Sequence, residues 1–176
     1  DADWKPSHIE LSFGNKCNFK CIYCCPQSSS SWMDEIERHG NYDVSYNQYG
    51  IEFLKDQFYK PDDYNPYINA FWKWWPELYK NLHVFRITGG EPLLSKHTFR
   101  LIDYVKKHNP EVIIGINSNF SVPKKSFERF MNAIQDIENK IQLWVSIESY
   151  GKKAEYARYG LDYNKFMSNV DIFLSN

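Results

Sequence analysis

The sequence lacks several features that would place it in a large class of proteins at once. Its apolar runs, such as VIIGI at 112–116, are far shorter than the roughly 20 residues that cross a bilayer. Residues 1–10 are polar and lack the apolar stretch of a signal peptide. The net charge is only −1 at pH 7, so neither nucleic acid nor a membrane surface is indicated as a partner. We therefore expect a soluble, cytoplasmic protein.

Cysteine is also absent from most of the chain. All 4 cysteines lie in the stretch GNKCNFKCIYCCPQ at 14–27. A disulfide framework normally uses more scattered cysteines and an oxidising compartment, so it is disfavoured. No second C-x2-C or H-x3-H pair completes the four ligands of a structural zinc site. Cys25 or His39 would be the available fourth ligand, and zinc therefore stays open as an alternative.

An iron–sulfur cluster explains the cysteine spacing best. Cys17, Cys21 and Cys24 form the pattern C-x3-C-x2-C, and thiolates are soft ligands suited to iron. Three cysteines for four irons leave one iron open to a substrate or cofactor. A thioredoxin-like use of Cys21 and Cys24 would leave Cys17 without a role. We expect Cys25 to be packed or solvent-facing and not a fourth ligand.

The rest of the chain has the pattern of alternating strands and helices. Strands are predicted at 8–13, 83–87, 111–116 and 141–147. Helices with one apolar face are predicted at 96–108, 124–137 and 164–174. The last three strands begin about one strand–helix unit apart, which indicates an α/β fold with a parallel sheet. The loops that follow the strands should converge on one rim of that sheet.

Residues 26–82 interrupt this regular spacing. We interpret about 26–70 as an insertion, with SSSSW as a helix start and helices predicted at 51–59 and 69–81. The last of these should pack against the sheet before the second strand. Four strand–helix units leave a bare edge strand after the fourth, so we expect the chain to be the front part of a longer domain.

The three-cysteine loop after the first strand, with Tyr23 before its last cysteine, resembles the radical S-adenosylmethionine superfamily. The resemblance implies a partial (β/α) barrel with outer helices, of which residues 1–176 would form the first four units of a six-unit core, incomplete at the C-terminus. It also implies a 4Fe–4S cluster on Cys17, Cys21 and Cys24, with S-adenosylmethionine bound at the open iron. The reduced cluster would cleave that cofactor to methionine and a 5′-deoxyadenosyl radical, which abstracts hydrogen from a substrate. An oxygen-sensitive enzyme and an electron donor such as flavodoxin or ferredoxin follow from the same resemblance.

The loop after the second strand carries the sequence TGGEP at 88–92. Glycines let a backbone approach a ligand closely, and the Glu91 carboxylate is suited to accept an ammonium group. An ordinary turn with a solvated glutamate is the alternative. The match to the glycine-rich motif of the superfamily implies that this loop binds the amino group of the methionine moiety, through Gly89, Gly90 and Glu91 beside Pro92.

Polar residues also follow the third and fourth strands. They are Asn117, Ser118, Asn119, Ser146 and Glu148. If the fourth strand stays regular, Ser146 and Glu148 face the barrel interior, and a charged residue there needs a partner. Arg158 would pair with Glu148 or with the cofactor carboxylate. The resemblance implies contacts of these residues and Tyr23 with the cofactor, although NSN departs from the T-N-G of many members.

The stretches WKWWPELYKNL and YARYGLDYNKF resemble the branch of the superfamily with twitch or SPASM extensions. This branch suggests a peptide or protein substrate first and a small metabolite second. The alternative function is an iron–sulfur or zinc-binding module without radical chemistry.

Overall fold

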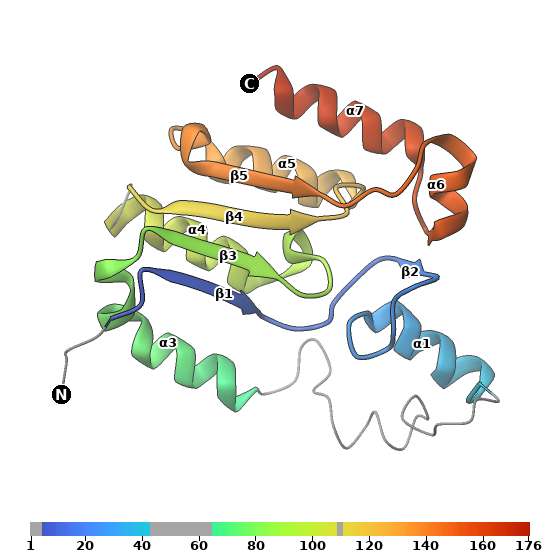
Figure 1. The fold of residues 1–176 in the computed structure, drawn as a ribbon, viewed down its shortest axis with the longest axis horizontal. Coiled ribbons are helices and arrows are strands. Elements are labelled where there is room, and N and C mark those ends of the chain that lie inside the picture. Colours follow the sequence, from blue (N-terminus) through green and yellow to red (C-terminus); the bar gives the residue numbers. More distant parts are fainter. Residues whose placement is uncertain (1–4, 43–64, 109–110) are drawn as a thin grey trace.

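A computed structural model describes residues 5–42, 65–108 and 111–176, and its centre is a four-stranded sheet (Figure 1). The strands, in spatial order, are β1 (His8–Ser12), β3 (Val84–Thr88), β4 (Ile113–Ser118) and β5 (Ile141–Val145). Every neighbouring pair in this sheet is parallel. The predicted α/β class is confirmed, and the described residues form an open sheet with flanking helices, as in a partial barrel.

Helices alternate with these strands along the chain. They are α1 (Ser30–His39), α3 (Pro66–Leu78), α4 (Lys96–His108), α5 (Lys124–Ile134), α6 (Gly151–Ala157) and α7 (Tyr163–Leu174). The bounds predicted for α4 are confirmed, and α5 ends earlier than predicted because Gln135 turns extended and Asp136 adopts a φ of 69°. The helix predicted at 51–59 lies outside the described residues. None of the described helices has the length and apolar character that a membrane span requires.

One face of the sheet packs against helices. Phe85 and Ile87 of β3 are completely buried, as are Ile114 and Ile116 of β4. Trp75 of α3 meets Phe85 edge to face at 5.3 Å between ring centroids. Each fully buried side chain of this size contributes roughly 1.5–3 kcal/mol, so this layer supplies much of the stability that holds the strand ends in place. In Figure 1, α4 and α5 lie behind the sheet.

The opposite face, which we call the open face, carries polar residues. Along each strand the side chains alternate between the two faces, and the register places Arg86 beside Glu10 on β1 and Gly115 on β4. Arg86 forms an ion pair with Glu10 at 3.3 Å and lies over the ring of Trp144 at 4.8 Å. Its Nε donates to Asn117 Oδ1 at 3.0 Å. The sheet therefore presents a charged and aromatic surface on the side opposite the helices that the structure describes.

A small second sheet joins two distant parts of the chain. Strand β2 (Lys20–Cys21) pairs in antiparallel fashion with β6 (Arg158–Tyr159), and Cys21 is directly opposite Arg158. This pairing brings the cysteine loop against the segment that follows α6.

Candidate functional site

The cysteine loop leaves β1 and is held by the serines that begin α1. Ser31 Oγ donates to the carbonyl oxygen of Cys17 at 2.7 Å, and the Cys17 N–H donates to Ser30 Oγ at 3.1 Å. The buried Ser29 hydroxyl donates to the Phe19 carbonyl at 2.6 Å. The run SSSS therefore has two tasks, since it starts a helix and also binds the backbone around the first cysteine.

The three motif cysteines provide thiols of suitable chemistry for a metal cluster. None of them forms a disulfide, Cys21 is buried, and Cys17 and Cys24 are half-buried. Burial raises the pKa of Cys17 to about 11 and also raises the pKa of Cys21 and Cys24. The Cys21 thiolate further raises the pKa of Cys17 and of Cys24, because like charges on neighbouring sulfurs repel. A metal that neutralises three thiolates would remove this repulsion, so the donor set fits a cationic iron–sulfur centre.

The three thiols are not yet arranged as a metal site in this structure. Within residues 5–42, 65–108 and 111–176, no three His, Cys, Asp or Glu side chains are gathered closely enough to hold a metal ion. The loop is held by the serines at one end and by β2 at the other. The backbone is thus fixed at Cys17 and at Cys21, so cluster binding would require the side chains to reorient and the segment around Cys24, beyond β2, to move toward them.

The GGEP loop after β3 lies directly on the cysteine loop. The Gly90 N–H donates to the Gly14 carbonyl at 3.1 Å, and the Glu91 N–H donates to the Lys16 carbonyl at 2.7 Å. A Cβ atom at Gly90 would lie 2.5 Å from the carbonyl carbon of Asn15, and one at Gly89 would overlap the hydroxyl of Ser12. We predicted that these glycines allow close approach to a ligand, and the structure shows that they allow close approach of two loops.

Glu91 joins the GGEP loop to the NSN loop after β4. Its side chain is only 2% exposed. Oε1 accepts from Ser118 Oγ at 2.7 Å and from the Leu93 N–H at 3.0 Å, while Oε2 accepts from the Asn119 N–H at 2.7 Å. Burial raises the pKa of Glu91 to about 7, although these hydrogen bonds act in the opposite direction. The carboxylate that we expected to accept an ammonium group thus also fixes the neighbouring loop.

The NSN loop is linked to the cysteine loop as well. Asn119 Nδ2 donates to Asn18 Oδ1 at 2.9 Å, and Asn18 Nδ2 donates to the Ser121 carbonyl at 3.2 Å. Ser118 is buried, whereas Asn117 lies on the open face beside Arg86. The three residues of NSN therefore have different positions, and Asn117 is the one that lies on the open face.

The segment after β5 completes the rim. The strand ends at Val145, so the regular alternation that we assumed for Ser146 and Glu148 does not extend to them. The Ser146 N–H donates to the Ser118 carbonyl at 2.9 Å. Glu148 pairs with Arg158, which is one of the two partners predicted for that arginine. Burial opposes ionisation of Glu148, but hydrogen bonds from Arg158 and Tyr23 outweigh it and lower the pKa of Glu148.

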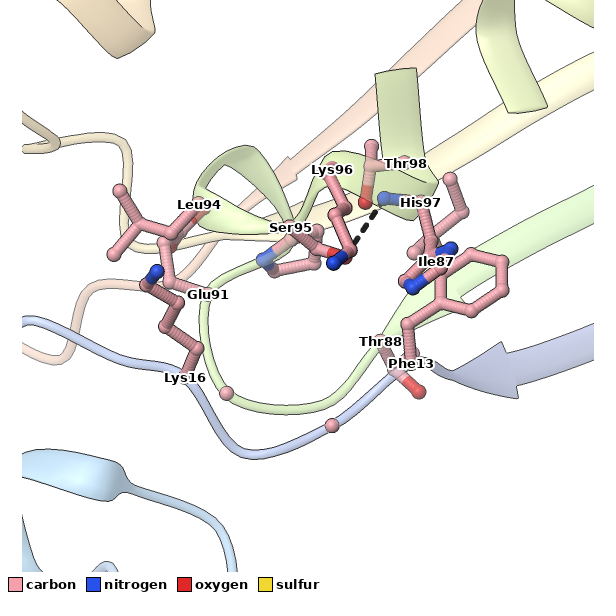
Figure 2. Close-up of a pocket in the computed structure, with 13 residues that line it drawn as sticks. Phe13, Lys16, Ile87, Thr88, Glu91, Leu94, Ser95, Lys96, His97 and Thr98 are labelled. Atoms are coloured by element: carbon pink, nitrogen blue, oxygen red, sulfur yellow. Dashed lines mark hydrogen bonds between the residues drawn. The ribbon is translucent and has the colours of Figure 1, made fainter. Parts of the chain in front are cut away.

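A pocket of about 80 Å³ lies beside this rim, between the cysteine loop and the start of α4. Figure 2 shows Lys16, Glu91 and Leu94 on one side of it and Phe13 and Ile87 on the other. The lining includes Gly90 and Pro92 of the GGEP loop but none of the cysteines. The pocket therefore adjoins the candidate site from the helix-covered side and is not the place where the thiols meet.

Sequence reasoning missed several residues that shape the site: Asn18, Ser29, Ser30, Ser31 and Arg86. For Arg86 a signal was available, because a charged residue inside the apolar strand HVFRI has to face a polar surface. For the serines and Asn18 the contacts are between loops, and no spacing in the sequence indicates them.

No family model matches the chain. Curated proteins named GTP 3′,8-cyclase are similar to it. The one from Helicobacter pylori strain J99 is 29% identical over 118 residues, which is 66% of this chain and 29% of the relative. The one from Nautilia profundicola is 25% identical over 115 residues, 65% of this chain and 28% of the relative. The one from Sulfurimonas denitrificans is 21% identical over 155 residues, 88% of this chain and 39% of the relative.

The matched region thus spans less than two fifths of the length of these relatives. GTP 3′,8-cyclases are radical S-adenosylmethionine enzymes, whereas the placement in the twitch or SPASM branch stays a prediction. The chain shares with the superfamily the three-cysteine loop, the GGEP loop and a parallel sheet that brings the two together. These shared features make the chain similar to the enzymes of the radical S-adenosylmethionine superfamily.

Proposed function

We propose that this chain binds a 4Fe–4S cluster and S-adenosylmethionine and initiates a radical reaction on a small molecule. The observation that carries the proposal is the hydrogen bonding among the four loops at one rim, with three thiols on the first of them. When bound, the reduced cluster supplies the electron that cleaves S-adenosylmethionine to methionine and a 5′-deoxyadenosyl radical, which takes hydrogen from the substrate.

In this proposal Cys17, Cys21 and Cys24 are the cluster ligands, and the chain sets the conditions for their binding. Because burial keeps the thiols protonated at neutral pH, cluster uptake must release protons. The serines of α1 fix the backbone at Cys17 and the β2–β6 pairing fixes it at Cys21, so the segment around Cys24 is the part that has to adjust. Cys25 is half-buried with its Sγ near Ser28 Oγ at 3.8 Å, and we assign it no metal.

The GGEP loop is proposed to receive the methionine end of the cofactor. Gly89 is exposed at the rim, with a φ of 95° that side chains rarely adopt. Glu91 Oε2 accepts one hydrogen bond and keeps capacity for another, so a contact with the amino group is compatible with its role between the loops. Pro92 begins a short 3-10 helix that ends the loop. The polar residues after β4 and β5 would complete this surface.

The substrate is proposed to lie on the open face. The relatives are named for GTP, which favours a small molecule over the peptide or protein that the branch resemblance suggested. Arg86, with Asn117 and Trp144 beside it, is the charged group best placed to contact such a molecule. An electron donor such as flavodoxin or ferredoxin and a cytoplasmic location complete the proposal, which the free thiols of the cysteine loop support.

Anaerobic reconstitution tests this function. The chain is loaded with iron and sulfide, reduced, and given S-adenosylmethionine, and 5′-deoxyadenosine is measured with and without GTP. We expect the wild-type chain to form 5′-deoxyadenosine and Cys21→Ala to form none. Cys25→Ala should keep both the cluster and 5′-deoxyadenosine formation. Product that rises when GTP is added would support a nucleotide substrate.

Two results would contradict the proposal. A chain that takes up zinc but no iron would favour the binding-module alternative. A chain that holds a complete, reduced cluster and still forms no 5′-deoxyadenosine from S-adenosylmethionine would show that these residues alone do not carry the reaction.

A further inference from the structure

A connected set of side chains links Cys21 to the loop after β5. Arg158 Nη1 donates to Cys21 Sγ at 3.9 Å, within the range for sulfur acceptors. Arg158 Nε donates to Glu148 Oε2 at 2.7 Å, and its Nη2 donates to Glu148 Oε1. Tyr23 Oη donates to the same Oε1 at 2.6 Å. All three nitrogens of the guanidinium group thus have acceptors within the protein.

The backbone fixes this arrangement. Arg158 is the direct partner of Cys21 in the β2–β6 ladder, and the Ile22 N–H donates to the Ala157 carbonyl at 3.0 Å. The guanidinium group also lies over the Tyr23 ring at 5.5 Å. Cys21 and the two residues after it are therefore held by Arg158 and its neighbour Ala157. The position of its charge next to Cys21 is set by strand pairing and not by a flexible surface side chain.

The charges around Arg158 make the contact with sulfur significant. Arg158 is only 6% exposed, and it forms an ion pair with Glu148. Two of its nitrogens go to that carboxylate, and the third is directed at a thiol, which is a weak acceptor. A thiolate ligating iron is a far better acceptor, and donors to ligand sulfur are among the factors that set the reduction potential of a cluster.

We propose that Arg158 is a positioning residue that raises the reduction potential of the cluster through Cys21, and that Glu148 and Tyr23 hold it in place. This inference rests on the proposed function, because it requires a cluster on the three cysteines. It also gives Tyr23, Glu148 and Arg158 a task other than the cofactor contacts predicted from the sequence. Positive charge beside a ligand sulfur stabilises the reduced form, which carries one more electron.

A redox titration of the reconstituted chain, followed by the electron paramagnetic resonance signal of the reduced cluster, tests the inference. In Arg158→Gln, reduction should become about tenfold less favourable, which for one electron is a potential about 59 mV more negative. Arg158→Lys should recover part of the shift, because it keeps the charge but cannot serve Glu148 and Cys21 together. Arg100→Gln is the control, since that arginine stacks on Trp72 at 3.9 Å, on the helix side.

An unchanged potential in Arg158→Gln with full iron content would overturn the inference. If Arg158→Gln holds no iron, the reduction potential of Arg158→Lys is the deciding measurement. A wild-type potential in Arg158→Lys would then also overturn the inference. If the wild-type chain takes up no 4Fe–4S cluster, the proposed function fails together with this inference. A wild-type cluster with normal 5′-deoxyadenosine formation, but no shift in either variant, removes this inference alone.

Discussion

Phe120 shows at the scale of one residue how the rim is adapted to the core beneath it. The residue follows NSN with a φ of 52°, in the left-handed region, and its ring is completely buried. It packs edge to face against Phe127 at 5.5 Å and Phe173 at 5.8 Å. A left-handed backbone costs a side-chain-bearing residue roughly 1–2 kcal/mol, which the buried ring offsets.

We predict that Phe120→Gly is more stable than Phe120→Ala by about 1 kcal/mol, although both lose stability relative to wild type. Both variants remove the ring, but only glycine adopts this φ without strain. Urea unfolding of the three proteins checks the order. An alanine variant more stable than the glycine variant would show that the left-handed backbone is not maintained in solution.

Glu91 gives the second prediction at the residue scale, on pH dependence. Its pKa is about 7 in the folded chain, against an ordinary value of 4.5. Between these values the folded chain binds more protons than the unfolded chain, so the stability that Glu91 contributes falls as the pH rises. We expect a loss of up to about 3 kcal/mol between pH 5 and pH 8.

Urea unfolding of wild type and Glu91→Gln at both pH values measures this loss. Glutamine does not titrate, and the other ionisable groups are common to both proteins, so the difference between the two isolates Glu91. Two stability profiles that run parallel from pH 5 to pH 8 would contradict the prediction.

At the scale of elements, the start of α1 is responsible for the shape of the cysteine loop. Ser29→Ala leaves the buried Phe19 carbonyl without its hydroxyl donor, and we expect a loss of about 1–3 kcal/mol. Ser28→Ala is the matched control, because Ser28 is exposed and should change stability by less than about 0.5 kcal/mol. The check is to measure the free energy of unfolding of both variants and of wild type. Equal losses would mean that the serine run does not hold the loop.

Elements with long apolar patterns could be predicted from the sequence, and short ones could not. Helix α4 shows a full apolar face over Lys96–His108, and its bounds were predicted correctly. Strands β2 and β6 contain two residues each, so they have no period to detect. Their pairing depends on where β1 and β5 place the chain, which is tertiary information. The Arg158–Cys21 contact was out of reach for the same reason.

At the scale of the whole molecule, hydrogen bonds connect the four loops in series. In the GGEP loop, the Gly90 N–H donates to the cysteine loop and Glu91 accepts from Ser118 of the NSN loop. The Ser118 carbonyl in turn accepts from the Ser146 N–H in the loop after β5. We predict that Gly90→Ala lowers the hydrogen-exchange protection of the Asn119 and Ser146 amides, because its Cβ would lie 2.5 Å from the Lys16 carbonyl oxygen and force the first two loops apart.

The control for this prediction is Gly115→Ala. Its Cβ would also lie 2.5 Å from a neighbour, but that neighbour is the edge of the half-exposed Trp144 ring, which can turn away. Exchange should then stay close to wild type at Asn119 and Ser146. Equal effects of the two substitutions, or none, would show that the loops respond independently.

The meeting of the four loops could be predicted because parallel strands place their carboxyl ends at one edge. The role of each residue in these loops could not be predicted. Glu91, Ser118 and Asn119 each have the chemistry of a ligand contact, and a sequence does not show that they hydrogen-bond with one another. Only the packed geometry separates residues that face a ligand from residues that hold the loop.

The strand order has a consequence for how this molecule folds. Strand β3 pairs with β4, and β4 pairs with β5, each the next strand along the chain, whereas β1 pairs with β3 across everything between Ser12 and Val84. Longer closures are slower and cost more chain entropy, so we expect β1 to join the sheet last. Because the cysteine loop follows β1 directly, its thiols would reach their places only after the GGEP and NSN loops have formed. The chain would then remain able to accept iron and sulfide until its final folding step.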